Sequence, residues 1–209
     1  MNLIFDLDGT LIDSSNRMYT LFQELVPQSN LTKEEYWGLK RDKVNHKKLL
    51  EKFYPEVDFE DFNSRWMSMI EEERFLIMDT NYPDTVEVLD TLARKNKLYL
   101  LTARQSEEGL KKELNRLGLD RFFTEILTTA GKTPKDVLLD SFMDSNPKTF
   151  CSDDWFISDM GADILTGKSK GFRTIGITHG FMNDTRLKEY APDYIVNELR
   201  ELVSIIGHS

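Results

Sequence analysis

The sequence predicts an α/β protein in which a doubly wound parallel sheet carries a small α-helical domain inserted near its start. Residues 80–209 alternate short apolar runs with amphipathic stretches, and such strand–helix alternation is typical of a parallel sheet covered by helices on both faces. Residues 15–79 instead show helical periodicity almost throughout. We therefore expect a core domain made of residues 1–14 and 80–209, and a helical domain made of residues 15–79.

Three helical patterns support the inserted domain. The first carries apolar residues at helical spacing and ends at Pro27, which cannot continue a helix. The second is predicted to begin at Thr32, because Glu35 follows three residues later and the two form a capping-box signal. The third places aromatic and methionine side chains on one face over residues 59–70. Stripes of this kind are typical of packing, so we expect them in the interior of the helical domain.

The core domain is expected to start with a short apolar strand and to continue as alternating strands and helices. The expected strands are residues 2–5, 97–101, 125–127, 155–157, 174–177 and 194–196. The expected helices are residues 106–117, 134–142, 162–170, 184–190 and 198–206, besides one that ends near residue 95. Gly118 marks a helix end, and Asp84 with Glu87 three residues later predicts a capping box.

Polar residues follow three of the expected strands. Asp6 and Asp8 come directly after the first, Thr102 ends the second, and Asp159 follows a third, with Asp163 four residues later. Ligands bind at the carboxyl ends of the strands in such sheets, so these side chains should lie close together. Two carboxylates about 4 Å apart repel by roughly 4 kcal/mol at an effective dielectric constant near 20, so the group requires a cation. Oxygen donors without clustered histidine or cysteine favour Mg²⁺.

Composition narrows the classes of partner. The 209 residues include 27 Lys and Arg against 36 Asp and Glu, a formal net charge of −9, which excludes nucleic-acid binding by charge. No apolar run reaches the roughly 20 residues that a membrane-spanning helix needs, and the start lacks the features of a signal peptide. The single cysteine, Cys151, can form neither an intrachain disulfide nor a zinc cage. We expect a cytoplasmic protein with no nucleic-acid or membrane partner.

The strand-end motifs resemble those of the haloacid dehalogenase superfamily. The segment from Asp6 to Thr10 has the sequence DLDGT, and phosphatases of that superfamily carry DxDGT at the end of the first strand. Thr102, a downstream lysine and the acidic segment that begins at Ser158 follow in the family's order. The resemblance covers nearly the whole chain. It implies a Rossmann-like core with a helical cap and, because Asp8 is present, phosphate chemistry of the phosphoglycolate-phosphatase-like type rather than dehalogenation.

Roles for individual residues are implied by this resemblance. Asp6 would be the nucleophile that forms an aspartyl phosphate, and Asp8 the general acid and base. Magnesium would be held by Asp6, by the backbone carbonyl of Asp8 and by Asp159, with Asp163 as a further ligand or a residue behind the ligands.

The phosphoryl group itself would be bound by Thr102 and Lys132, and Lys135 is the alternative lysine. In the family pattern Pro more often follows the lysine directly, whereas Thr133 intervenes here. Two further departures are Ser158, where Gly commonly precedes the acidic residue, and Ala103-Arg104 after the threonine. Arg104 either contacts substrate or forms an ion pair at the surface or at a helix end.

The predicted function is a magnesium-dependent phosphatase that acts on a small phosphorylated metabolite, as a monomer or homodimer. A phosphomutase on a sugar phosphate, or a non-catalytic binding protein of the same fold, are the alternatives; an isomeric product would distinguish the mutase. A basic stretch in the inserted domain supplies candidates for substrate specificity, and its alternative explanation is a solvated helix face. These candidates are Lys40, Arg41, Lys43 and His46.

Overall fold

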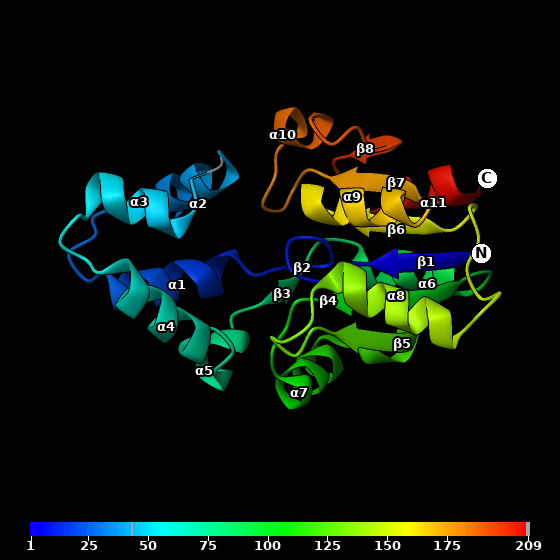
Figure 1. Cartoon of the computed structure of the whole chain (residues 1–209), viewed down its shortest axis with the longest axis horizontal. Helices are drawn as coiled ribbons and strands as arrows, with labels where there is room; N and C mark the ends of the chain where they lie inside the picture. Colours follow the sequence, from blue (N-terminus) through cyan, green and yellow to red (C-terminus); the bar gives the residue numbers. More distant parts are fainter. Residues whose placement is uncertain (43, 208–209) are drawn as a thin grey trace. The chain divides into compact units, whose positions relative to one another are not determined.

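The computed structural model describes residues 1–42 and 44–207 (Figure 1). The chain forms two compact units, one of Met1–Asp13 with Thr80–Ser209 and one of Ser14–Asp79. The first is called the core unit below, and the second the helical unit.

A parallel sheet lies at the centre of the core unit. Among the described residues its strand order is β5-β4-β1-β6-β7-β8, and every neighbouring pair is parallel. The strands are β1 (Asn2–Phe5), β4 (Lys97–Thr102), β5 (Phe123–Thr128), β6 (Trp155–Ser158), β7 (Arg173–Ile177) and β8 (Tyr194–Val196). Because β1 lies between β4 and β6, the loops that leave these three strands meet at one edge. The predicted parallel α/β fold is confirmed.

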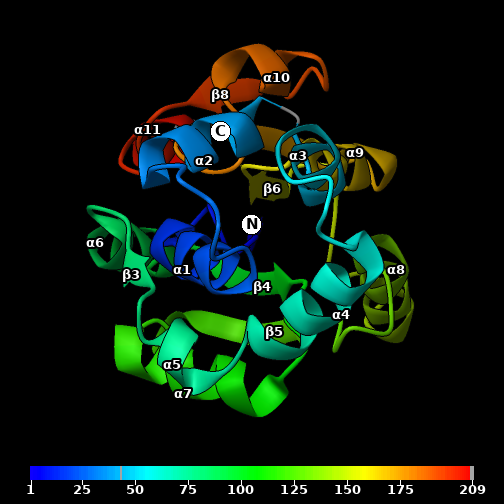
Figure 2. The same cartoon turned by 90° about the vertical axis from the view of Figure 1, so that its left-hand side faces the viewer.

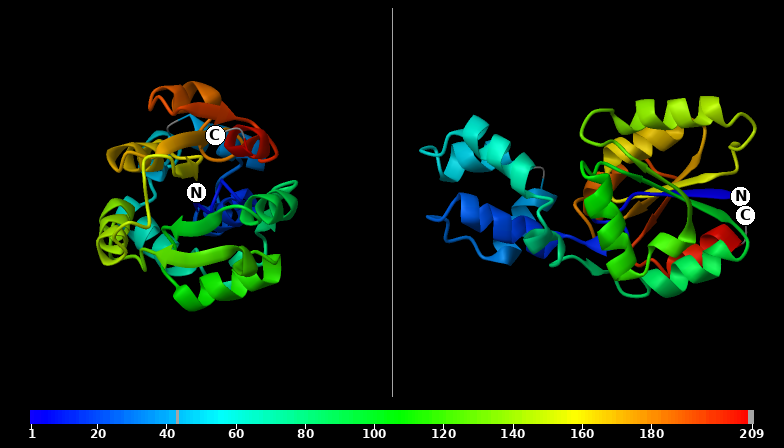
Figure 3. Two further views of the ribbon diagram at one scale, coloured as in Figure 1. Left: turned by 90° about the vertical axis from the view of Figure 1, so that its right-hand side faces the viewer. Right: turned by 90° about the horizontal axis from the view of Figure 1, so that it is seen from below.

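Helices cover both faces of this sheet, as the right-hand view of Figure 3 shows for α8 and α9 against α6 and α11. They are α6 (Thr85–Ala93), α7 (Glu107–Leu117), α8 (Lys135–Ser145), α9 (Gly161–Ser169), α10 (Asp184–Lys188) and α11 (Glu201–Gly207), with a short 3₁₀ helix η1 (Asp120–Phe122). On one face Leu3 and Phe5 of β1 pack with buried leucines of α6, α7 and α11. On the other, Ile4 packs with Leu139 of α8 and Phe156 of β6. The alternation of side chains along β1 therefore feeds two cores.

The ends of two helices test the predicted caps. Helix α7 follows the expectation, because Ser106 accepts a hydrogen bond from the Gly109 N–H and the helix ends at Gly118 with φ +70°. The predicted capping box before α6 is wrong. Asp84 has a left-handed φ of +64° and makes no side-chain cap bond; its carboxylate instead pairs with Arg200 at 2.9 Å. A capping side chain reaches the first turn from extended backbone, which Asp84 lacks.

The helical unit is built around α1. Its helices are α1 (Ser15–Leu25), α2 (Lys33–Arg41), α3 (His46–Phe53), α4 (Phe59–Met69) and α5 (Glu73–Leu76). Helix α1 packs against α2, α4 and α5 (Figure 2). Phe62 and Trp66 of the predicted stripe are buried with Phe22 in its core. The capping box at Thr32 is present, because its hydroxyl accepts from the Glu35 N–H at 3.2 Å and its own N–H donates to the Glu35 carboxylate at 2.8 Å.

A short antiparallel pair in the core unit, β2 (Ile12–Asp13) and β3 (Thr80–Asn81), lies where the chain leaves and re-enters that unit. Across the described part of the chain, no helix combines the length and apolar character needed to cross a bilayer.

Candidate active site

The loop after β1 is a tight turn that presents Asp6 and Asp8. The N–H of Gly9 donates to the carbonyl of Ile12 at 2.9 Å, and Gly9 has a left-handed φ of +83°. A Cβ at Gly9 would lie 2.3 Å from Oδ2 of Asp159. Glycine is therefore required both by the backbone conformation and by the close approach of the Asp159 carboxylate.

Thr10 joins the loops after β1 and β6. Its hydroxyl lies 3.1 Å from Asp159 Oδ1 and 3.4 Å from Asp6 Oδ2, and it accepts a hydrogen bond from the Asp159 N–H at 3.0 Å. The N–H of Phe181, which follows β7, donates to the other Asp159 oxygen at 2.6 Å. Asp159 is thus fixed by residues of two other loops and is fully buried.

The lysine that contacts the nucleophile candidate is Lys135. Its Nζ lies 2.6 Å from Asp6 Oδ1 and 2.7 Å from Asp163 Oδ2, and its side chain is 14% exposed. The expectation that Lys132 occupies this place is corrected by the geometry, which selects the alternative. Lys132 lies in an exposed turn, where its N–H donates to the Thr129 carbonyl, whereas Lys135 is the first residue of α8.

Ser158, which stands where the family pattern commonly has glycine, makes two hydrogen bonds. Its hydroxyl donates to Asp163 Oδ2 at 2.8 Å and accepts from the Met160 N–H at 3.0 Å. Asp163, in the first turn of α9, therefore receives both Ser158 and Lys135 on one oxygen. Asp163 therefore belongs to the hydrogen-bond network that holds Lys135 against Asp6.

Burial dominates the electrostatics of the carboxylates. It raises the pKa of Asp6 from 3.8 to about 6, although Lys135 opposes that rise. Burial, followed by the charge of Asp6, raises the pKa of Asp159 well above its ordinary value. For Lys135 burial alone would lower the pKa, but the carboxylates of Asp6 and Asp163 raise it above 10.5. The cluster has more negative than positive charge, and a further cation would stabilise it.

The donor set fits a hard cation. Within residues 1–42 and 44–207, no three His, Cys, Asp or Glu side chains form a ready-made metal cluster. The carboxylates of Asp6 and Asp159, linked through Thr10, supply two oxygen donors, and magnesium usually takes only one or two carboxylates. The side chains present are therefore compatible with magnesium.

Thr102 ends β4 beside β1, and its hydroxyl is a buried group. It is 1% exposed, and in the described structure Oγ1 has no hydrogen-bond partner. An unsatisfied buried hydroxyl costs about 1–3 kcal/mol. A phosphoryl oxygen is the kind of acceptor that would satisfy it.

Asp8 is held by an arginine whose position the sequence left open. Arg104 donates from Nε to Asp8 Oδ2 at 2.7 Å and from a terminal nitrogen to Asp8 Oδ1 at 2.9 Å. The same terminal nitrogen lies 2.8 Å from Glu113 of α7. Arg104 forms an ion pair, but a buried one at 3% exposure, not one at the surface.

Sequence reasoning missed Glu113, although a signal was present. Glu113 lies between Leu110 and Leu114 on the buried face of an amphipathic helix. A charged residue among buried leucines needs a buried partner. An arginine two residues after a strand end was the available candidate.

The specificity candidates belong to the helical unit. His46 lies in its aromatic cluster, with Nε2 2.8 Å from the Tyr36 hydroxyl and the ring centre 4.2 Å from that of Trp66. Lys40 and Arg41 end α2, and burial lowers the pKa of Lys40 to about 8. Lys43 lies outside the described residues. The ring contacts of His46 favour a packing role for it.

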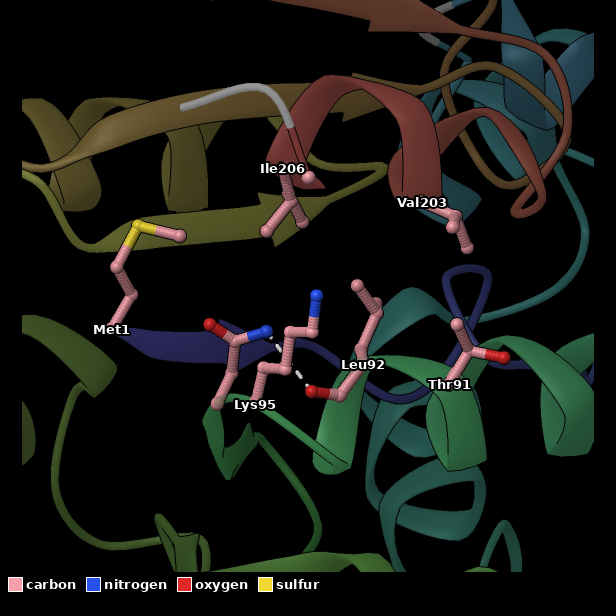
Figure 4. Close-up of a pocket in the computed structure, with 8 residues that line it drawn as sticks. Met1, Thr91, Leu92, Lys95, Val203 and Ile206 are labelled. Atoms are coloured by element: carbon pink, nitrogen blue, oxygen red, sulfur yellow. Dashed lines mark hydrogen bonds between the residues drawn. The ribbon is translucent and has the colours of Figure 1, made fainter.

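A pocket of about 310 Å³ lies at the amino ends of β1 and β4, beside α6 and α11 (Figure 4). Met1, Leu92, Val203 and Ile206 are among the residues that line it. None of its lining residues belongs to the predicted site, which lies at the carboxyl ends of the strands.

Comparison with known proteins agrees with this geometry. Residues 3–177 match the family model described as haloacid dehalogenase-like hydrolase. The pyrophosphatase PpaX of Oceanobacillus iheyensis is 24% identical over 216 residues, covering 99% of this chain and 97% of its own. A phosphoglycolate phosphatase of Vibrio parahaemolyticus is 22% identical over 220 residues, covering 99% and 96%.

Solved structures share the fold. The haloacid dehalogenase-like family protein SP0104 of Streptococcus pneumoniae superimposes with a TM-score of 0.79 at 20% identity, covering 98% of this chain and 97% of the other. The protein YfnB of Bacillus subtilis, solved with magnesium bound, gives 0.68 at 22% identity, with coverage of 98% and 97%. Because the family model spans most of the chain, and the strand-end carboxylates lie together where the predicted motif requires, the chain belongs to the haloacid dehalogenase-like hydrolase family.

Proposed function

We propose that this protein is a magnesium-dependent phosphatase that hydrolyses a small phosphorylated metabolite through an aspartyl phosphate on Asp6. The observation that carries the proposal is the surroundings of Asp6: a buried carboxylate with a lysine 2.6 Å from one oxygen, on the loop that also presents Asp8. The buried carboxylate supplies a nucleophile, and the adjacent lysine favours its ionised form.

In the first step, an oxygen of Asp6 attacks phosphorus while the bond from phosphorus to the leaving oxygen breaks. Asp8, which is 22% exposed, gives its proton to that leaving oxygen. In the second step, Asp8 takes a proton from a water molecule that attacks the aspartyl phosphate, and inorganic phosphate and free Asp6 result. Lys135 and the Thr102 hydroxyl stabilise the negative charge on the transferring group.

Magnesium would be held by Asp6, by Asp159 and by the backbone carbonyl of Asp8, with Asp163 behind them. When bound, it supplies positive charge that offsets the repulsion between the buried carboxylates and the incoming phosphate. Asp163 acts through Lys135, which its carboxylate orients.

The names of the relatives support a small substrate, because both phosphoglycolate and pyrophosphate are small phosphorylated anions. The basic residues Lys40 and Arg41, with His46, are the proposed contacts for the part of the substrate beyond the phosphate. We further propose a cytoplasmic monomer or homodimer.

The test is phosphate release from a panel of phosphoglycolate, sugar phosphates, nucleotides and pyrophosphate, with and without magnesium. Wild-type protein and the matched control Asp140→Asn, which alters an exposed carboxylate of α8, should release phosphate from at least one member. Asp6→Asn should lose at least about 10³-fold in kcat while remaining folded. Undiminished turnover in Asp6→Asn would remove the nucleophile assignment, and an isomeric product without phosphate would indicate a mutase.

A further inference from the structure

A buried ion pair of Arg104 and Glu113 contacts Asp8 through the arginine. Arg104 and Glu113 are 3% and 1% exposed, and their side chains meet at 2.8 Å. Arg104 also reaches Asp8 with two N–H groups, at 2.7 and 2.9 Å. One guanidinium therefore joins a carboxylate on the loop after β1 to a carboxylate on α7.

Packing alone does not explain this pair. Buried ion pairs rarely stabilise a protein more than well-packed apolar side chains of the same volume, because desolvation offsets the attraction. Glu113 lies between the buried residues Leu110 and Leu114, a setting that would accept another leucine. The Arg104–Glu113 ion pair is therefore better explained by its contact with Asp8 than by a contribution to the stability of α7.

Arg104 is held at both its backbone carbonyl and its guanidinium. The Thr128 hydroxyl, at the end of β5, donates to the Arg104 carbonyl and accepts from the Ala130 N–H at 3.3 Å. Glu113 fixes the far end of the side chain. A fork held in this way sets the plane of the Asp8 carboxylate as well as its position. Each oxygen keeps a second lone pair that faces away from the guanidinium.

We propose that Arg104, anchored by Glu113, is a positioning residue that sets the Asp8 carboxylate for proton transfer to the leaving oxygen. This inference rests on the proposed function, in which Asp8 is the general acid. The arginine does not touch the transferring phosphoryl group in this account. It acts through the carboxylate that it holds.

A positioning role for Arg104 predicts a kinetic difference between two substrates that a merely structural role does not predict. A misplaced acid slows departure of an alkoxide, which needs a proton, but hardly affects p-nitrophenolate, which leaves without one. Arg104→Lys keeps the positive charge and loses the two-pronged fork. We expect phosphoenzyme formation from an alkyl phosphate to slow by about 10–100-fold, and that from p-nitrophenyl phosphate by less than about 3-fold.

The experiment measures single-turnover phosphoenzyme formation by acid quench with both substrates. Arg116→Gln is the matched control. Arg116 also lies near Glu113, at 3.9 Å, but its side chain is 37% exposed, whereas the hydrogen bonds to the Asp8 carboxylate come from Arg104. The control variant should match wild type with both substrates. If Arg104→Lys fails to fold, the double variant Arg104→Met/Glu113→Leu removes both buried charges and should show the same split.

Equal slowing of both substrates, or no slowing of the alkyl phosphate, overturns the positioning role. The proposed function is judged separately, by whether wild-type turnover is lost in Asp6→Asn. Wild-type turnover that Asp6→Asn abolishes, together with equal slowing in Arg104→Lys, would refute this inference and leave the phosphatase proposal intact. Absence of any wild-type turnover refutes both.

Discussion

The charge next to Asp6 depends on which of two lysines, three residues apart, reaches it. Lys135 begins α8 and lies against Asp6 and Asp163, whereas Lys132 stays in the exposed turn before it. A lysine 2.6 Å from a buried carboxylate interacts far more strongly with it than one in solvent, because water screens the latter.

Replacing Lys135 should therefore cost much more activity than replacing Lys132. We expect Lys135→Ala to lower kcat by about 10²–10³-fold, the range found when one stabilising donor is removed from a site of this kind. Lys132→Ala is the control and should change kcat by less than about 3-fold. Steady-state kinetics on the best substrate of the panel measure both. A larger loss in Lys132→Ala would reverse the assignment.

His46 should make stability depend on pH. Burial, and then the charge of Lys40, hold the pKa of His46 well below 6.5 in the folded state, while the unfolded chain keeps a value near 6.5. Above about pH 6.5 both states are neutral and the contribution to stability is complete. As pH falls below that value, the unfolded state binds a proton that the folded state does not, and stability falls.

Urea unfolding of wild type and His46→Gln at pH 5.5 and 7.5 measures this contribution. Wild type should lose about 1 kcal/mol more than the variant between the two values, since one proton per pH unit corresponds to about 1.4 kcal/mol. An identical loss in both proteins would show that His46 titrates normally.

At the scale of elements, an ion pair joins the beginning of the helical unit to its end. Arg17 of α1 lies 3.1 Å from Asp79, with exposures of 4% and 0%. Arg17 also donates to the carbonyl of Ile70 at 3.3 Å. The ion pair therefore connects the first helix of the helical unit to the last residue of that unit.

Arg17→Ala should destabilise the protein by about 3–5 kcal/mol, because it leaves a buried carboxylate without its arginine. The double variant Arg17→Met/Asp79→Leu removes both charges and should cost less. Arg74→Ala, which breaks pairs with Glu24 and Glu72 that are about half-exposed, is the control and should cost about 1 kcal/mol or less. Denaturant unfolding of the full chain gives the three values, and equal costs for Arg17→Ala and Arg74→Ala would contradict the argument.

At the scale of the whole molecule, an acidic protein with a net charge of −9 concentrates further negative charge at one sheet edge. Burial raises the pKa of both Asp6 and Asp159 there, and the charge of Asp6 raises the pKa of Asp159 further. Mg²⁺ bound to these groups should stabilise the folded state through mass action.

Magnesium at about 100 times its Kd should add about 2.7 kcal/mol, which for a protein of this size raises Tm by roughly 5–10 °C. Asp159→Asn should abolish that increase, because it removes a proposed carboxylate ligand. Asp140→Asn removes an exposed charge and should keep the full magnesium response. Thermal unfolding with EDTA and with added magnesium measures all three; an undiminished response in Asp159→Asn would place the metal elsewhere.

The sequence by itself determined the alternation of strands and helices, the inserted helical region and the motif that ends the first strand. These features depend on local patterns: apolar periodicity, glycine and proline at element ends, and polar residues directly after strands. The order of Asp6, Thr102 and Asp159 along the chain was enough to predict that they share one edge, because parallel strands bring their carboxyl ends together. The family match and the parallel sheet confirm the predicted fold class and family.

Only the tertiary structure decided which side chains touch. In the structure Lys135, and not Lys132, contacts Asp6, and Asp84 makes no capping hydrogen bond to α6. Ser158 donates to Asp163, and Arg104 binds Asp8, which lies 96 positions earlier in the sequence. Each of these outcomes depends on the direction of a side chain at a loop or helix end, and on groups far apart in the chain. Local propensity does not specify such directions, because burial and charge at the assembled sheet edge determine which arrangement has the lowest free energy.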